Sequence, residues 1–323
     1  MEINNRNQII QEISQLLTKE GFETSDIYGQ SCFDMVARKK LLILVLKALV
    51  NIDSINESHV EEIRKISNIF LASPLIIGLK TKNHILEEDV VYERHGIPAI
   101  GLTTLKNMIM YDEYPDVLAD RGGYFVNING NVLKEFREEY SLSLKDLADL
   151  AHVSRETIYK YETGKVRANA ETAMNLEELL NTKITLDIDL LEPYKEETNL
   201  KGAIANESND KTTTDLAKLG FGVVSTKKSP FDALAKTDIQ NKSTIDSPLI
   251  ANLEKNRNTK TLKKMAIPLK DLSLITSSES FFVINNKKFN ESIEGIPVIK
   301  SWEINEVDNS NDFIKMVKER KDN

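Results

Sequence analysis

The sequence predicts a multidomain protein in which two related α/β lobes flank a small helical domain. Its 323 residues are too many for one ordinary domain and suit two or three compact units. Helical patterns alternate with short apolar runs in the first third, which is typical of an α/β layer. Three short motifs of the first third return in the same order in the last third, and a pair of short polar-faced helices is predicted between the two copies.

Composition and charge exclude several classes of protein. The longest apolar run, 41–50, is interrupted by Lys47 and is much shorter than the roughly twenty residues that cross a bilayer. No signal-peptide pattern opens the chain, and its single cysteine, Cys32, excludes an internal disulfide and a thiolate zinc site. We therefore expect a cytoplasmic protein without membrane contact. The net charge of −8 argues against binding of polyanions by the whole surface, so any nucleic-acid contact must come from a local patch.

Residues 1–118 form the predicted first lobe. The first residues form a predicted amphipathic helix that ends at Gly21, and its apolar face consists of Ile9, Ile10, Ile13, Leu16 and Leu17. The elements predicted after it are strands over 33–38 and 41–49, a helix over 57–70, strands over 75–79 and 97–101, and a helix capped by Thr103 that runs to residue 110. Pro115 and the turn at 121–123 mark the predicted end of this lobe.

Residues 122–192 form the predicted helical domain. Its elements are a strand over 124–128, helices over 132–140, 144–151, 155–162 and 171–180, and a strand over 184–190 that can pair with the first strand. Ser143 and Ser154 precede the two middle helices as N-caps, and only the turn at 152–154 separates these helices. This spacing predicts a helix-turn-helix.

The second helix of this pair turns a polar face outward. Base edges in the major groove are read through hydrogen bonds, so donors and acceptors are needed on that face. The predicted base contacts are Arg155, Glu156, Thr157 and Lys160. The predicted phosphate contacts, at helix ends and in the following loop, are Ser143, Ser154, Thr163, Lys165 and Arg167. Five basic and four acidic residues lie between Lys145 and Arg167, so one copy carries little positive charge and we expect a homodimer on double-stranded DNA.

This central segment resembles the Cro/cI-type repressor family over about residues 131–185. The residues that carry the resemblance are Leu133, Phe136, Arg137, Ser143, Leu147-Ala148, Val153-Ser154, Ile158, Tyr161-Glu162 and Gly164-Lys165. The resemblance implies a structural ion pair between Arg137 and Glu162, and it places base-contacting positions at Arg155, Glu156 and Lys160.

Two positions depart from that family. Leu144 stands where a glutamine is usual, which removes one phosphate or base contact, and Ala168 stands where a proline is usual, which leaves the loop less rigid. Short helix pairs of this kind also occur in unrelated bundles, in which Ile158 and Tyr161 would serve only as core residues.

The last part of the chain divides into a linker and a second lobe. Residues 193–213 are polar and predict a flexible linker, and 214–323 form the predicted second lobe. The repeated motifs pair Leu17–Phe22 with Leu216–Phe221, Phe33–Arg38 with Phe231–Lys236, and Gly96–Ile100 with Gly295–Ile299. Asp34 and Gly96 lie 62 residues apart, and Asp232 and Gly295 lie 63 apart, so order and spacing both indicate a repeat.

Each lobe resembles the restriction-endonuclease-like fold, in which an acid pair and a lysine on adjacent strands hold magnesium. Asp34 and Lys47 fit two of those places, but Val45 stands where the second acid is expected. The second lobe keeps Asp232 and offers Glu254 in place of the lysine and Asn252 in place of the acid. Both sites therefore look degenerate, and we predict neither a catalytic residue nor a bound metal or other cofactor.

A simpler role for Asp34 is to cap a turn or to pair with Arg38. The histidines have no metal-site spacing, and neither a phosphate-binding glycine loop nor a nucleophile elbow is present.

The architecture as a whole resembles a family of archaeal transcriptional regulators. The first hypothesis is a sequence-specific, dimeric, double-stranded DNA-binding regulator that is not an enzyme. The alternatives are a magnesium-dependent DNA nuclease and a protein-interaction scaffold that uses the helical domain. The lobes would supply dimerisation, ligand sensing or DNA clamping, and nothing in the sequence indicates which small molecule, if any, acts as effector.

Overall fold

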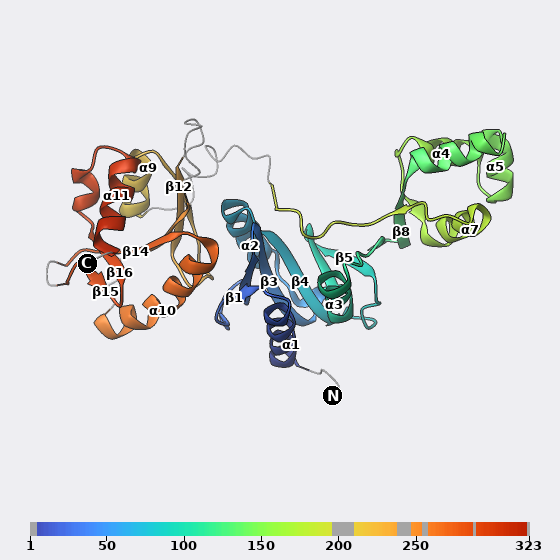
Figure 1. The fold of residues 1–323 in the computed structure, drawn as a ribbon. Helices are drawn as coiled ribbons and strands as arrows, with labels where there is room; N and C mark the ends of the chain where they lie inside the picture. Colours follow the sequence, from blue (N-terminus) through green and yellow to red (C-terminus); the bar gives the residue numbers. More distant parts are fainter. Residues whose placement is uncertain (1–4, 196–209, 238–246, 254–257, 287–288, 322–323) are drawn as a thin grey trace. The chain divides into compact units, whose positions relative to one another are not determined.

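The computed structural model describes residues 5–195, 210–237, 247–253, 258–286 and 289–321 (Figure 1). The chain divides into two compact units, one formed by Met1–Ile9, Leu49–Ser54 and Leu75–Leu190 and the other by Ile10–Ala48, Ile55–Pro74 and Leu191–Asn323. Residues 196–209 of the predicted linker lie outside the described residues. Within the described part, no helix combines the length and apolar character that a bilayer crossing requires.

The first sheet has the strand order β1-β2-β3-β4-β6-β5-β7-β8-β10, and β9 pairs with β8. Its strands are β1 (Glu23–Thr24), β2 (Met35–Lys39), β3 (Leu42–Asn51), β4 (Ser73–Lys80), β5 (Val90–Arg94), β6 (Ile97–Gly101), β7 (Val117–Asp120), β8 (Gly123–Ile128), β9 (Ala168–Asn169) and β10 (Thr185–Leu186). Strands β1 to β3 are antiparallel neighbours, and β4 runs parallel to β6. Strand β3 is buried from Ile43 to Ala48, and it confirms the strand predicted over 41–49.

Three α-helices accompany the first part of this sheet: α1 (Arg6–Lys19), α2 (Glu57–Phe70) and α3 (Leu102–Tyr111). Helix α2 has the predicted bounds, because Asn56 caps its first turn and Leu71 ends it in the left-handed conformation. The prediction that Thr103 caps α3 was wrong. Strand β6 runs directly into this helix, so Gly101 is the N-cap, without a side-chain hydrogen bond, and Thr103 lies inside the first turn.

Two strands that the sequence did not predict, β5 and β7, connect the sheet of the first lobe to β8. Strand β5 pairs with β6 in antiparallel and with β7 in parallel orientation, and β7 forms a hairpin with β8. Gly122 and Gly123 at the hairpin turn have φ of 95° and 145°, values that glycine adopts without steric cost. The sheet of the first lobe therefore continues past its predicted end at Pro115 and the turn at 121–123, into β7 and β8.

The helices of the central segment are α4 (Gly130–Glu139), α5 (Leu144–Leu150), α6 (Arg155–Glu162) and α7 (Ala170–Leu180). They enclose one core with β8, in which Leu133, Leu147, Ile158 and Leu176 are at most 1% exposed. Strand β10 pairs with β8 through Thr185 and Ile128, which confirms the predicted pairing, although β10 has only two residues.

The second sheet has the order β11-β12-β13-β14-β16-β15, which reproduces the order of the first six strands of the first sheet. Its elements are α9 (Lys211–Lys218), β11 (Phe221–Ser225), β12 (Ala233–Thr237), β13 (Leu249–Asn252), α10 (Thr259–Thr276), β14 (Glu279–Ile284), β15 (Ser292–Ile293), β16 (Ile296–Lys300), the 3-10 helix η2 (Glu303–Glu306) and α11 (Ser310–Lys321). As in the first sheet, the two leading pairs are antiparallel, and the strand after the long helix runs parallel to the strand with the Gly-Ile-Pro motif.

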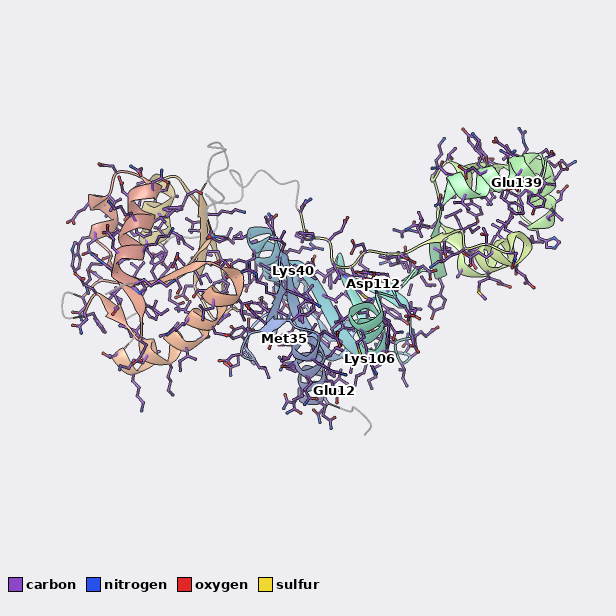
Figure 2. The ribbon with its side chains drawn as sticks, in the orientation of Figure 1. Glu12, Met35, Lys40, Lys106, Asp112 and Glu139 are labelled. Carbon is purple, nitrogen blue, oxygen red and sulfur yellow. The ribbon has the colours of Figure 1, made fainter. Side chains whose placement is uncertain are left out.

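Apolar side chains lie mainly in the interior of both units, and charged side chains lie mainly on the surface. Met35 in β2 is 1% exposed, whereas Glu12 in α1, Lys106 in α3 and Glu139 in α4 are exposed (Figure 2). Apolar burial of this kind stabilises each layer, since it removes hydrocarbon surface from water.

Candidate nucleic-acid interface

Two serine caps define the helix pair α5–α6. The Ser143 hydroxyl accepts from the amide of Asp146 at 3.1 Å, and the Ser143 amide donates to the Asp146 carboxylate at 2.8 Å, which completes a capping box. The same contacts with Ser143 hold the pKa of Asp146 below its usual value. The Ser154 hydroxyl accepts from the amide of Thr157 at 3.1 Å. Both serines are exposed, so their hydroxyls cap the helices at the protein surface.

Helix α6 presents a short polar face. Arg155 and Glu156 are exposed, and Lys160 is half-buried and pairs with Glu156 at 2.8 Å between Nζ and Oε1. This contact lowers the pKa of Glu156. Thr157 is half-buried and lies 2.8 Å from the Ser154 hydroxyl, oxygen to oxygen. A solvent-exposed ion pair contributes little stability, so a base edge can replace the Glu156–Lys160 contact at small cost.

The loop after α6 holds the other predicted phosphate contacts. The Thr163 hydroxyl donates to the carbonyl of Tyr159 at 2.8 Å, and Gly164 follows with φ of 63°. The ammonium of Lys165 lies 5.3 Å from the ring centroid of Tyr159, a cation–π contact that orients it. Arg167 is half exposed, and its Nη1 atom lies 3.9 Å from the Asp120 carboxylate. The loop therefore carries two cations, Lys165 and Arg167, next to the end of the helix.

An ion pair fixes the far end of α6. The Arg137 guanidinium donates through Nε and Nη2 to the two carboxylate oxygens of Glu162 at 2.6 and 3.1 Å, and through Nη1 to the carbonyl of Leu142 at 3.1 Å. The two side chains are only 14% and 7% exposed. This contact raises the pKa of Arg137. Because Glu162 is occupied by this inward pair, its charge does not offset the cations of the exposed face.

Close packing between α4 and α6 depends on Gly130. A Cβ atom at this position would lie 2.6 Å from the Glu162 carbonyl carbon and 2.7 Å from the Tyr161 carbonyl oxygen. These are backbone atoms, so the first turn of α4 can approach the end of α6 only if residue 130 has no side chain.

Gly130→Ala is expected to destabilise the helical segment by about 1–3 kcal/mol, the usual cost of overpacking a filled site. Gly29→Ala is the matched control, since a Cβ there would meet nothing within 4 Å. Hydrogen exchange of the α4 and α6 amides in both variants measures the effect. Equal protection of these amides in the two variants would show that the contact is not tight.

The predicted acidic site of the first lobe is a buried ion pair. Asp34 is 1% exposed and Lys47 6% exposed, and the Lys47 ammonium donates to Asp34 Oδ1 at 3.2 Å and to the Ser31 carbonyl at 2.9 Å. The other carboxylate oxygen of Asp34, Oδ2, accepts a hydrogen bond from the amide of Ala48 at 2.7 Å. The alternative partner, Arg38, instead donates to the carbonyl of Lys40.

The strand register corrects the predicted correspondence between the two lobes. Met35 lies opposite Leu46, and Ala233 lies opposite Ala251, so Asp34 faces Lys47 and Asp232 faces Asn252. Asp232 Oδ2 also accepts from the amide of Leu253 at 3.0 Å, as Asp34 does from Ala48. Asn252 therefore occupies the lysine place and not the acid place. Glu254, which was predicted at the lysine place, lies outside the described residues.

These positions do not fit a divalent cation. Magnesium requires oxygen ligands in octahedral array, yet the second acid position is Val45 in the first lobe and, by register, Ile250 in the second. Both are fully buried apolar side chains. The remaining carboxylate, Asp34, already accepts from an ammonium group and an amide.

Comparisons with known proteins agree with this organisation. Residues 6–115 match the PD-(D/E)XK superfamily domain, and 133–186 match a helix-turn-helix family. A protein of Methanobrevibacter smithii is 62% identical over 320 residues, which cover 99% of each chain, and carries the provisional name HTH-type transcriptional regulatory protein. The chain belongs to this family of archaeal regulators.

Other members of the family carry the same provisional name. The relative from Methanothermobacter thermautotrophicus is 56% identical over 317 residues, which cover 98% of this chain and 97% of its own. The relative from Pyrococcus furiosus is 33% identical over 315 residues, which cover 97% and 98%. The likeness thus extends through both lobes as well as the helix-turn-helix.

Sequence reasoning missed two features of this regulator family member. Gly130 was not singled out, although the Asn129-Gly130 pair before a helical pattern is a signal for a capped, closely packed helix start. Asp120 was not connected with Arg167, because this contact depends on β7, which the sequence did not predict.

Proposed function

We propose that this chain is a sequence-specific regulator of transcription that binds double-stranded DNA with α6 in the major groove. The observation that carries the proposal is the polar face of α6, which presents Arg155, Glu156 and Lys160 on a helix fixed at both ends. A rigid helix with exposed donors and acceptors has the shape and the chemistry that major-groove reading requires.

The polar side chains of α6 contact bases, and those at helix ends and in the following loop contact phosphates. Arg155 and Lys160 donate to guanine, Glu156 accepts from a cytosine amine, and Thr157 lies beside them at the first turn. Ser143, Ser154, Thr163, Lys165 and Arg167 contact phosphates on either side and set the register of the helix on DNA.

The protein acts as a dimer in this proposal. Lys165 and Arg167 are the main cations beside α6, and the exposed face also contains Glu156, so one copy neutralises few phosphates. Two α6 helices about 34 Å apart would double the contacts. Helices α4 to α7 are proposed to form a Cro/cI-type bundle within 122–192, between domains at 1–118 and 214–323.

Selection from a random duplex library at moderate salt tests the proposal with the full chain. The expected result is one enriched motif made of two related half-sites. Recovery of no motif would instead favour a scaffold whose helical segment binds protein.

The match of residues 6–115 to the PD-(D/E)XK superfamily favours a second candidate, a magnesium-dependent DNA nuclease. We infer against it, because Val45 cannot ligate a hard cation and Lys47 neutralises Asp34. Supercoiled DNA incubated with the protein and magnesium should stay intact. Cleavage that Asp34→Ala abolishes would overturn this inference.

A further inference from the structure

A polar cleft lies beside the loop that follows α6. Its volume of 740 Å³ is within the range of small-ligand sites. The 3-10 helix η1 (Ile52–Ser54), the loop after β4, strand β5, the β7–β8 hairpin and Arg167 form its walls. Its acidic, basic and histidine side chains are Asp53, His84, Glu93, Arg94, Asp120, Arg121 and Arg167.

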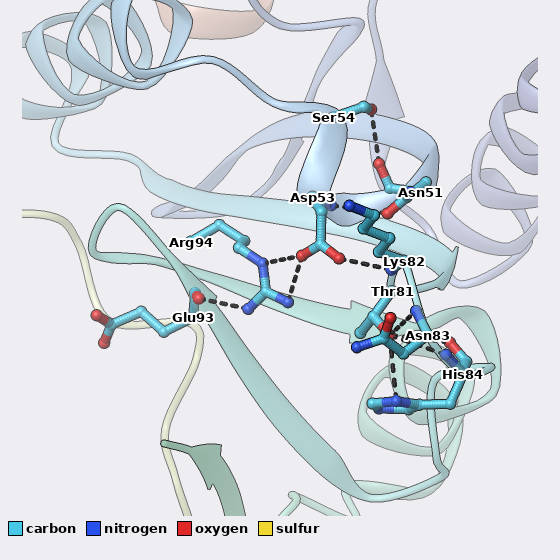
Figure 3. Close-up of polar contacts among 9 residues, drawn as sticks. All are labelled: Asn51, Asp53, Ser54, Thr81, Lys82, Asn83, His84, Glu93 and Arg94. Carbon is cyan, nitrogen blue, oxygen red and sulfur yellow. Dashed lines mark hydrogen bonds and ion pairs between the residues drawn. The ribbon is translucent and has the colours of Figure 1, made fainter. Parts of the chain in front are cut away.

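Hydrogen bonds hold the guanidinium group of Arg94 in place at the edge of the cleft. Arg94 donates through Nε to Asp53 Oδ1 at 2.6 Å and through Nη1 to the Glu93 carbonyl at 2.7 Å, while Asp53 Oδ2 accepts from the amide of Lys82 at 2.5 Å (Figure 3). Burial by itself raises the pKa of Asp53, but these contacts with Lys82 and Arg94 outweigh it and the pKa is lowered. Arg94 is therefore held in one geometry, and the ion pair neutralises the Asp53 charge.

His84 is fixed on the neighbouring loop. The Thr81 hydroxyl lies 3.2 Å from His84 Nδ1 and also donates to the His84 carbonyl at 3.2 Å (Figure 3). Because the Thr81 hydroxyl occupies Nδ1, the other ring nitrogen of this exposed imidazole, Nε2, is the one that can contact a ligand.

Two further guanidinium groups, those of Arg121 and Arg167, line the cleft. Asp120 Oδ1 accepts from the amide of Arg121 at 2.6 Å, whereas Asp120 Oδ2 lies 3.9 Å from Arg167 Nη1. The exposed Arg121 side chain has no ion-pair partner among the described residues. Of the lining carboxylates, Glu93 alone makes no ion pair with a described residue, and its negative charge disfavours a bound anion. Three arginines thus face three carboxylates around this cleft, and Arg121 is the arginine whose charge is not offset by an ion pair among the described residues. Guanidinium groups bind phosphate oxygens in pairs, so a phosphate oxygen can occupy Arg121 and replace the long Asp120 contact of Arg167.

We propose that this cleft binds a small ligand carrying a phosphate or diphosphate group, and that the bound ligand competes with DNA for Arg167. The competition rests on the proposed DNA-binding function, whereas ligand binding does not. Arg167 both lines the cleft and follows α6 in the loop that contacts phosphate, so its guanidinium cannot serve both anions at once.

Calorimetric titration of the full chain with inorganic pyrophosphate tests the site without DNA. Saturable binding of one pyrophosphate is expected, weakened at least about tenfold in Arg121→Gln and in Arg94→Gln, since each loses a charge-assisted contact. Lys106→Gln, which removes one positive charge from the exposed face of α3, should bind as the unaltered chain does. Absence of binding, equal binding of sulfate, or full binding by both arginine variants would overturn the proposal.

DNA affinity measured with and without pyrophosphate, at constant ionic strength, tests the competition. Affinity should fall in the unaltered chain and stay constant in Arg121→Gln. If pyrophosphate binds and DNA affinity does not change, the competition is refuted. If pyrophosphate binds and no DNA binds, the proposed function fails and the ligand site stands. If both arginine variants lose DNA affinity in the absence of pyrophosphate, the phosphates in the cleft are those of DNA and the small-ligand proposal is wrong.

Discussion

Replacing Lys47 with methionine is expected to lower the free energy of unfolding of the first lobe by about 3–5 kcal/mol, since it leaves a buried carboxylate without its cation. Asp34 is 1% exposed, and the Lys47 ammonium supplies the contact to Oδ1. Methionine retains the apolar stem but donates neither to Asp34 nor to the Ser31 carbonyl, which lies 2.9 Å from the ammonium. Hydrogen exchange of the β2 and β3 amides measures the loss locally, which avoids assuming two-state unfolding of a multidomain chain.

Two variants isolate this effect. Lys106→Met removes a lysine from the exposed face of α3 and should change stability by less than about 0.5 kcal/mol. The double variant Asp34→Asn with Lys47→Met removes both charges of this pair and should recover much of the loss. If the double variant is as unstable as Lys47→Met, the ion pair is not what holds β2 and β3 together.

Arg137→Met is expected to destabilise the helix-turn-helix segment by about 3 kcal/mol, because Glu162 would lose both charge-assisted hydrogen bonds in a site only 7% exposed. The carbonyl of Leu142, which lies in the connection between α4 and α5, loses this donor as well. Exchange of the α6 amides should accelerate, and specific DNA affinity should fall with it, since the orientation of α6 depends on the pair.

Lys134→Met is the matched control for Arg137→Met. Lys134 is on the same helix, is 54% exposed, and its one ion pair with a described residue is a long contact of 3.9 Å with Glu138. Its removal should leave the α6 amides unchanged. The role assigned to the Arg137–Glu162 pair would be refuted if both variants exchanged at the same rate.

Local patterns in the sequence were sufficient for the longer elements of the fold. Helix α2 was predictable because its apolar residues recur at helical spacing and Asn56 caps it. Helices α5 and α6 were predictable because Ser143 and Ser154 precede apolar patterns of the right period. Strand β3 was predictable because it is apolar and flanked by polar residues.

Elements that depend on distant pairing could not be predicted in this way. Strand β7 has four residues, none fully buried, and its partners are β5 in parallel and β8 in antiparallel orientation. The place of Asn252 opposite Asp232 likewise follows from strand register, because the sequence between the repeated motifs offers no marker for it. The polar cleft depends on β7 and its hairpin, so its residues looked unrelated along the chain.

The central claim is that α6 reads base pairs, and comparison of Arg155→Ala with Lys165→Ala on a selected DNA site tests it most directly. Arg155→Ala should weaken specific binding by about 1–3 kcal/mol and relax the preference at one base pair of each half-site. Lys165→Ala should weaken binding to all sequences alike and reduce the slope of log affinity against log salt by about one. Equal losses on the selected site and on random DNA for Arg155→Ala would contradict the claim.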